Sequence, residues 1–220
     1  MKQSKTNPPA SHGSLESNLL VDFGDLWSDA QKIWDRYQDT PAFSGYVSAD
    51  YLAVYRALLP LCGTGMTFLE WGSGLGVVTI MANRMGFDAC GIEAESGLVE
   101  HARELSRAYA PRAVFAMGSF FPDQFVGDET VTSATGRTIR NVNSAYGEIG
   151  KQLDEFDLVY AYPWPNERML YRSVMRECGR RGAIFLTYDS RSGMDVLQVR
   201  RGSRDEPARG QVTRRRLDGS

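Results

Sequence analysis

The sequence predicts an α/β fold, a doubly wound and mostly parallel sheet whose last strand is antiparallel. Apolar runs with the period of a strand alternate with segments that carry an apolar stripe at helical spacing. Strands that alternate with helices pair in parallel through right-handed crossovers. Only the short Asp189–Gly193 turn joins the last two strand-like runs, so we expect these two to be antiparallel. A chain of 220 residues that is 42% hydrophobic is enough for one domain with its own core.

Two helices are predicted before the first strand. Residues 1–24 are rich in Ser, Asn, Pro and Gly, and we expect them to form a disordered tail. An apolar stripe that starts at Asp25 predicts the first helix. Ser48 is an N-cap candidate for a second helix that ends at Pro60. These helices open a domain that we expect to span residues 25–201.

The sheet and its crossover helices are predicted from the rest of the domain. Strand-like runs lie at 66–71, 87–93, 112–118, 156–162, 182–188 and 194–200. Apolar stripes at helical spacing lie at 77–85, 98–109 and 170–178.

Two segments depart from this rhythm. Residues 123–155 form a long polar insert, which we interpret as a lid or binding loop, with hairpin arms at 130–132 and 138–140 and a short helix at 144–153; a disordered segment is the alternative. Residues 202–220 mix arginines with acidic residues and predict a basic mobile tail.

Composition excludes several classes of protein. Lys and Arg number 25 against 27 Asp and Glu, and the resulting net charge of −2 excludes a globally basic nucleic-acid-binding protein. Cys62, Cys90 and Cys178 are too widely spaced for a disulfide framework or a zinc cluster, and we expect no metal site. No apolar run approaches the roughly 18 residues of a membrane span. The first 24 residues contain no secretion signal, so we expect a soluble cytoplasmic protein.

The most informative segment is Glu70-Trp71-Gly72-Ser73-Gly74-Leu75-Gly76, where the first strand passes into a helix. Glycines at such a turn let the backbone bend sharply and approach a ligand closely. Val77 stands where a dinucleotide-binding Gly-x-Gly-x-x-Gly has its last glycine. Glu70 would repel a diphosphate and attract an ammonium group. The segment therefore indicates a zwitterionic ligand without phosphate; a tight turn that binds nothing is the alternative.

A second carboxylate, Glu93, ends the second strand in Cys90-Gly91-Ile92-Glu93. An acid at this place can accept the hydroxyl hydrogens of a ribose. The alternative is a surface acid stabilised by the following helix dipole, a role for which Glu95 is better placed.

These two motifs together resemble the class I S-adenosylmethionine-dependent methyltransferases, over about residues 64–200. The resemblance implies a Rossmann-like methyltransferase fold that holds S-adenosylmethionine across the carboxyl ends of the first strands. It implies that Glu70 and the glycine loop (Gly72, Ser73, Gly74 and Gly76) bind the methionine portion and that Glu93 binds the ribose. It also implies that Ala94 lies beside the adenine.

The same resemblance suggests further cofactor contacts. Members often have an acid for the adenine amine after the third strand, where this chain has Ser119 and Phe120; we expect Ser119 to bond the adenine and Phe120 to pack on it. Gly45-Tyr46-Val47-Ser48 is similar to small protein-lysine methyltransferases, and this places Tyr46 and Ser48 near the cofactor.

The fourth strand is followed by Tyr162-Pro163-Trp164-Pro165-Asn166, which resembles the Asp/Asn-Pro-Pro-aromatic motif of amino-group methyltransferases. Tyr162 replaces the acid or amide of that motif, which argues against a nucleic-acid base as acceptor. Tyr162 and Trp164 are suited to flank an amine through cation–π contacts. With Asn166 they are the candidate catalytic residues. The alternative is a rigid turn in which Asn166 caps the next helix.

The sequence thus predicts an S-adenosylmethionine-dependent methyltransferase that acts on an amine nitrogen of a protein or a small molecule. Two alternatives stay open: a non-catalytic S-adenosylmethionine-binding scaffold and an NAD-dependent oxidoreductase. Neither the acceptor nor the oligomeric state follows from the sequence.

Overall fold

A seven-stranded sheet forms the centre of the molecule. The computed structural model describes residues 12–126, 138, 142–199 and 213–215. The strand order is β3-β2-β1-β4-β5-β6-β7. The strands are β1 (Thr67–Trp71), β2 (Asp88–Glu93), β3 (Val114–Met117), β4 (Leu158–Ala161), β5 (Ile184–Asp189), β6 (Gly193–Gln198) and β7 (Thr213–Arg215).

The pairing confirms the predicted fold class. Strands β1 to β5 pair in parallel, while β5 with β6 and β6 with β7 are antiparallel. Each of the six predicted strands forms, within one to two residues of its expected ends. Strand β1 lies between β2 and β4, so the chain reverses its direction of winding there. In such sheets, ligands bind at the carboxyl ends of the strands beside this reversal.

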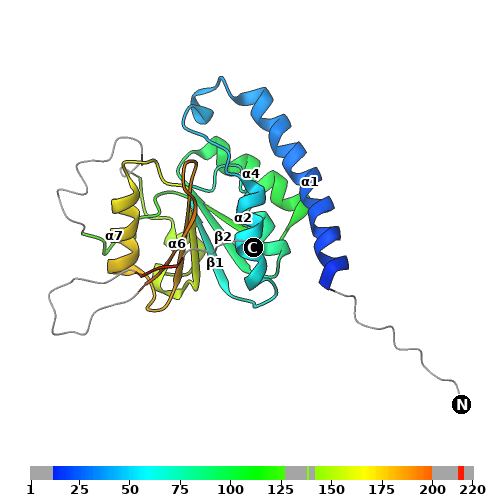
Figure 1. The fold of residues 1–220 in the computed structure, drawn as a ribbon. Coiled ribbons are helices and arrows are strands. Elements are labelled where there is room, and N and C mark those ends of the chain that lie inside the picture. Colours follow the sequence, from blue (N-terminus) through cyan, green and yellow to red (C-terminus); the bar gives the residue numbers. More distant parts are fainter. Residues whose placement is uncertain (1–11, 127–137, 139–141, 200–212, 216–220) are drawn as a thin grey trace, which may run out of the picture.

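Helices cover both faces of the sheet (Figure 1). One face packs against α1 (His12–Tyr37), α2 (Tyr51–Leu58), α3 (Val77–Arg84) and α4 (Ser96–Tyr109), and the other against α6 (Tyr146–Ile149) and α7 (Arg168–Cys178). Single 3-10 turns lie at η1 (Pro41–Phe43), η2 (Leu59–Leu61) and η3 (Leu153–Glu155). Each face has its own apolar core, so both faces of β1 and β4 are buried.

The first helix begins earlier than predicted. Helix α1 begins at His12, so residues 12–24 are helical and the expected disordered tail at 1–24 is wrong for this part; residues 1–11 lie outside the described range. Phe23 explains the difference, because its side chain is only 1% exposed and its ring lies 5.8 Å from that of Tyr55 on α2. A contact so distant in sequence is not visible in local composition.

Three other boundaries also differ. The N-cap of α2 is Asp50 rather than Ser48, because its carboxylate accepts the Ala53 N–H at 2.9 Å. In the insert, the helix expected at 144–153 is a single turn that Gly150 ends with a φ of 72°. The hairpin arms lie outside the described residues except for Thr138.

The C-terminal segment also departs from the expected tail. Residues 213–215 form β7, which pairs with Val196–Gln198 of β6. The prediction of a mobile tail is therefore wrong for these three residues, because their backbone pairs with the edge of the sheet. The rest of 202–220 lies outside the described residues.

We expect Phe23→Ala to lower the free energy of unfolding by about 3–5 kcal/mol, because it leaves a cavity between α1 and α2. Denaturant titration measures the change. Val21→Ala is the matched control on the same helix; Val21 is 70% exposed, and its loss should change stability by less than about 0.5 kcal/mol. Equal effects of the two substitutions would show that α1 does not dock as described.

Candidate functional site

A cavity of about 580 Å³ lies at the carboxyl ends of β1, β2 and β4, and we call it the central pocket. Its size is typical of small-molecule sites. Most of the site residues predicted from the sequence line it: Tyr46, Glu70, Gly72, Ser73, Gly74, Glu93, Ala94, Ser119, Phe120, Tyr162 and Trp164.

Three predicted site residues do not line the pocket. Ser48 is exposed, and its hydroxyl donates to the Ala49 carbonyl at 3.4 Å. Gly76 is the buried N-cap of α3, where a Cβ would lie 2.5 Å from the Phe115 ring, so its lack of a side chain serves packing. Asn166 is exposed and does not cap α7 either, since Glu167 holds that position.

The glycine loop turns through residues in the left-handed region. Gly72 has a φ of 68° and Gly74 a φ of 54°. A Cβ on Gly74 would lie 2.4 Å from the Tyr46 ring, whereas nothing lies within 4 Å of that position on Gly72. Gly74 therefore admits the ring of Tyr46 against the loop, and Gly72 keeps space open beside it.

Glu93 ties the end of β2 to this loop. One carboxylate oxygen accepts the Gly74 N–H at 2.8 Å, and the other accepts those of Ala94 at 2.7 Å and Glu95 at 3.0 Å. Burial raises the pKa of Glu93, and the three backbone N–H groups oppose this shift. Two carboxylate oxygens offer about four acceptor sites, so Glu93 keeps acceptor capacity for a ligand hydroxyl.

Glu70 is a buried carboxyl at the centre of the pocket wall, with 5% of its surface exposed. Its Oε2 accepts both the backbone N–H of Thr79 at 2.9 Å and the Thr79 hydroxyl at 2.6 Å. Burial raises the pKa of Glu70 to about 8, because desolvation outweighs these two bonds. A cation beside Glu70 would offset that desolvation and favour the carboxylate.

Two buried hydroxyls in the pocket wall lack a partner among the described residues. They are the Ser73 Oγ and the Tyr160 hydroxyl. A buried polar group without a hydrogen bond costs about 1–3 kcal/mol, so such groups point to a missing partner. Both hydroxyls are therefore available to a ligand.

The charge of the pocket is one-sided. Four acidic side chains line it, those of Glu70, Glu93, Glu95 and Asp189, and the described lining contains no Lys, Arg or His. Asp189 is compensated by an ion pair with Arg168 and by the Arg191 N–H at 2.8 Å. The pocket thus suits a cationic or zwitterionic ligand and disfavours one that carries phosphate.

Several pocket residues were not predicted from the sequence: Tyr51, Thr138, Tyr160, Tyr171 and Asp189. Tyr160 lies opposite Glu70 in the register of β1 and β4. A strand order predicted from the sequence, with β4 beside β1, would have indicated this residue. Tyr51 carries no such signal, because the docking of α2 brings it to the pocket.

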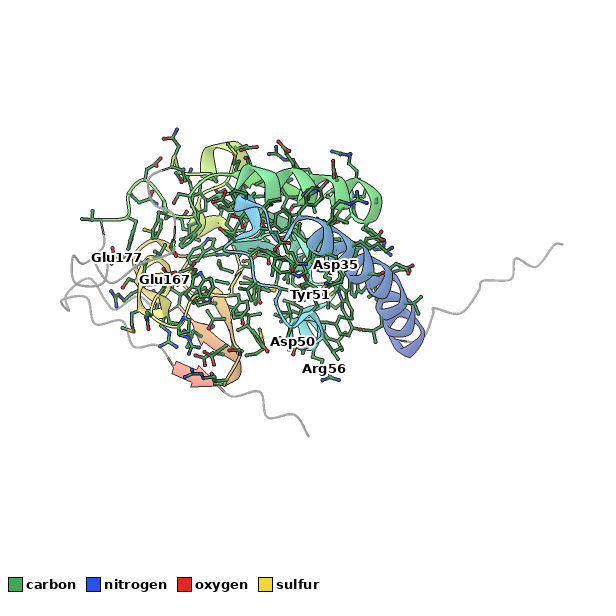
Figure 2. All side chains as sticks on the ribbon, turned by 90° about the horizontal axis from the view of Figure 1, so that it is seen from above. Asp35, Asp50, Tyr51, Arg56, Glu167 and Glu177 are labelled. Atoms are coloured by element: carbon green, nitrogen blue, oxygen red, sulfur yellow. The ribbon has the colours of Figure 1, made fainter. Side chains whose placement is uncertain are left out.

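The pocket wall is completed from two distant helices. Figure 2 shows Tyr51 beside Asp50 at the start of α2, and Glu167 at the start of α7 on the other side of the molecule. Glu167 is 2% exposed and accepts the Thr138 N–H at 3.0 Å as well as the Thr138 hydroxyl. Thr138 is thereby held at the pocket.

The raised pKa of Glu70 predicts a pH dependence of stability. The ligand-free protein should lose stability as pH rises from about 4.5 to about 8, because folded Glu70 retains a proton there that the unfolded chain releases. Denaturant titration across this range measures the slope. Glu70→Gln should remove this component, and Glu100→Gln, at an exposed position of α4, should retain it. Identical slopes for parent and Glu70→Gln would contradict the assignment.

None of the described helices has the length and apolar character of a membrane span. No protein-family model and no curated protein sequence matches the chain.

Solved structures similar to this chain include three that contain S-adenosyl-L-homocysteine. One is an RNA methyltransferase from Salinibacter ruber (21% identity, TM-score 0.46, 65% of this chain and 78% of that one). Another is a putative protein-L-isoaspartate O-methyltransferase from Plasmodium falciparum (14%, 0.45, 93% and 94%). The third is an S-adenosylmethionine-dependent methyltransferase from Thiobacillus denitrificans (17%, 0.44, 70% and 54%).

Proposed function

We propose that the protein is an S-adenosylmethionine-dependent methyltransferase whose acceptor is an amine nitrogen on a protein or a small molecule. The charge of the central pocket carries this proposal. Carboxylates line a crevice at the carboxyl ends of the strands, and no cationic side chain lies among its described residues. S-adenosylmethionine is a zwitterion with a sulfonium and no phosphate, and it matches such a crevice.

The pocket residues fit this cofactor. Glu70 and the unpaired Ser73 hydroxyl are suited to the methionine ammonium and carboxylate, and Glu93 to the ribose. Ala94, Ser119 and Phe120 would lie around the adenine. The Ser119 Oγ already accepts the Phe121 N–H at 3.2 Å, and Phe120 stacks on Trp71 at 4.7 Å, so both are held in place before a ligand arrives.

When bound, the cofactor supplies an electrophilic methyl group on a sulfonium. The protein then has to orient the acceptor, exclude water and keep the attacking nitrogen unprotonated. Tyr162 and Trp164 line the same pocket as Glu70, and both are partly buried. Their aromatic faces are suited to hold an amine through cation–π contacts.

The two alternatives from the sequence are disfavoured to different degrees. An NAD-dependent oxidoreductase would need to place a diphosphate among Glu70, Glu93 and Glu95 without a cationic partner from the described lining. A non-catalytic scaffold would have the same pocket. Measurement of turnover distinguishes a scaffold from an enzyme, because a scaffold binds S-adenosylmethionine and yields no demethylated product with any amine.

Calorimetric titration with S-adenosylmethionine, S-adenosylhomocysteine and NAD tests the cofactor. We expect the first two to bind and NAD not to bind. Glu93→Ala should weaken the binding by about 1–3 kcal/mol, because it removes a charged hydrogen-bond acceptor. Glu100→Ala, a carboxylate loss at an exposed position of α4, is the control and should bind as the parent does. Unchanged affinity in folded Glu93→Ala would remove the ribose assignment.

Trp164→Ala should lower turnover more than cofactor affinity, because Trp164 is proposed to contact the acceptor. Steady-state kinetics with an amine acceptor and cofactor titration measure the two effects separately. A loss confined to cofactor affinity would place Trp164 in the cofactor site instead.

A further inference from the structure

Three tyrosines line the central pocket from different elements. Tyr51, Tyr160 and Tyr162 line it from α2, from β4 and from the segment after β4. The ring of Tyr188, on β5, meets that of Tyr162 edge to face at 5.1 Å and supports it from behind. Tyr51, Tyr162 and Tyr188 all lie close enough to Tyr160 to interact with it electrostatically, so these rings share one region.

Tyr160 is the residue of this wall whose hydroxyl lacks a partner. Its side chain is 1% exposed, and no described residue bonds its hydroxyl. The register of β1 and β4 places Tyr160 opposite Glu70, so the hydroxyl and the carboxyl belong to neighbouring strands at the crevice. A ligand group that donates a hydrogen bond would satisfy this oxygen.

The partners of the acidic side chains in the pocket indicate which sign of ligand charge this region accepts. Glu93 is bonded to three backbone N–H groups, and Asp189 is paired with Arg168. Glu70 is bonded only to neutral groups of Thr79, and burial raises its pKa to about 8, so it takes a negative charge when a cation such as the cofactor's ammonium lies beside it. The described lining of this region therefore offers no fixed positive charge, and its aromatic faces themselves attract an acceptor cation when water is excluded.

We propose that Tyr51, Tyr160 and Tyr162 form an acceptor subsite for an aliphatic ammonium group that already carries methyl groups, with Tyr160 accepting its remaining N–H. This inference rests on the proposed function. It extends that function by naming the acceptor class as methylated aliphatic amines and the product as a quaternary ammonium.

The transfer balances without a further reactant. The ammonium first gives up the N–H proton that is bonded to Tyr160, which passes to solvent water, and the free amine turns its lone pair from the Tyr160 oxygen toward the methyl carbon. The nitrogen lone pair then forms the new N–CH3 bond as the S–CH3 bond breaks, and the electron pair of that bond stays on sulfur, which becomes a neutral thioether. The quaternary product retains its charge against the tyrosine rings and has no N–H for Tyr160.

Binding to the cofactor-free protein tests the subsite with three probes of similar shape. N,N-dimethylethanolamine is a cation with one N–H, choline is a cation without one, and 3,3-dimethyl-1-butanol is the neutral isostere of choline. We expect both cations to bind at least tenfold more tightly than the neutral isostere, as calorimetry or tryptophan fluorescence would show. Equal affinity of choline and its isostere would overturn the proposal.

Two variants separate the roles of the rings and of the hydroxyl. Tyr162→Ala should weaken both cations about tenfold. Tyr160→Phe should weaken only N,N-dimethylethanolamine, because choline has no hydrogen to donate. Tyr109→Phe is the matched control, since the Tyr109 hydroxyl bonds Asp29 at 2.7 Å outside the pocket. If Tyr160→Phe binds N,N-dimethylethanolamine as the parent does, the hydroxyl does not hold the acceptor and the proposal is wrong.

Two further measurements identify the source of the amine and separate the subsite proposal from the proposed function. In a parallel titration, Nα-acetyl-Nε,Nε-dimethyl-lysine amide replaces N,N-dimethylethanolamine. Tighter binding of the lysine derivative assigns the amine to a protein, and tighter binding of N,N-dimethylethanolamine assigns it to a small molecule. Titration with S-adenosylhomocysteine runs beside them. If S-adenosylhomocysteine binds and the cations do not, the subsite proposal is wrong and the proposed function is retained. If the cations bind and S-adenosylhomocysteine does not, the proposed function is wrong.

Discussion

The hydrogen bond from the Gly74 N–H to the Glu93 carboxylate is the constraint on which the pocket depends. It joins the glycine loop after β1 to the end of β2, and Glu93 in turn fixes the first residues toward α4 through Ala94 and Glu95. The loop can take this course because Gly74 lies in the left-handed region, where a side chain would strain the backbone. One carboxylate thus sets the shape of the wall between two strands.

The rest of the pocket follows from the position of β1. With β2 on one side and β4 on the other, β1 brings Glu70 between the glycine loop and Tyr160. Burial of a carboxyl there has a cost, which appears as a pKa raised to about 8. Structures keep such costs where a ligand offsets them, and perturbed carboxyls therefore mark functional sites. The two unpaired hydroxyls beside it fit the same interpretation.

Local patterns predicted six of the seven strands, the antiparallel pairing of β5 with β6 and most of the predicted pocket residues, because strand periodicity and the glycine loop depend on consecutive residues. What they missed depends on contacts between distant segments. Phe23 gains its burial from α2, so the start of α1 at His12 was not visible. Tyr51 and Tyr160 reach the pocket through helix docking and strand register. Gly76 fits the same motif as Gly72 and Gly74, yet it serves packing against Phe115.

The contact of Tyr46 with the glycine loop has a consequence for the rate of ligand exchange. Tyr46 lies between Gly74 and the rings of Trp34 and Phe43, and its hydroxyl meets that of Tyr51 at 3.1 Å. The pocket-lining segment around Tyr46 is therefore held by α1 and α2 as well as by the glycine loop. Local opening of this anchor costs less than unfolding of the sheet. We therefore expect sequence changes on the buried faces of the N-terminal helices to alter how long a ligand stays in the pocket without altering the acidic groups that would bind it.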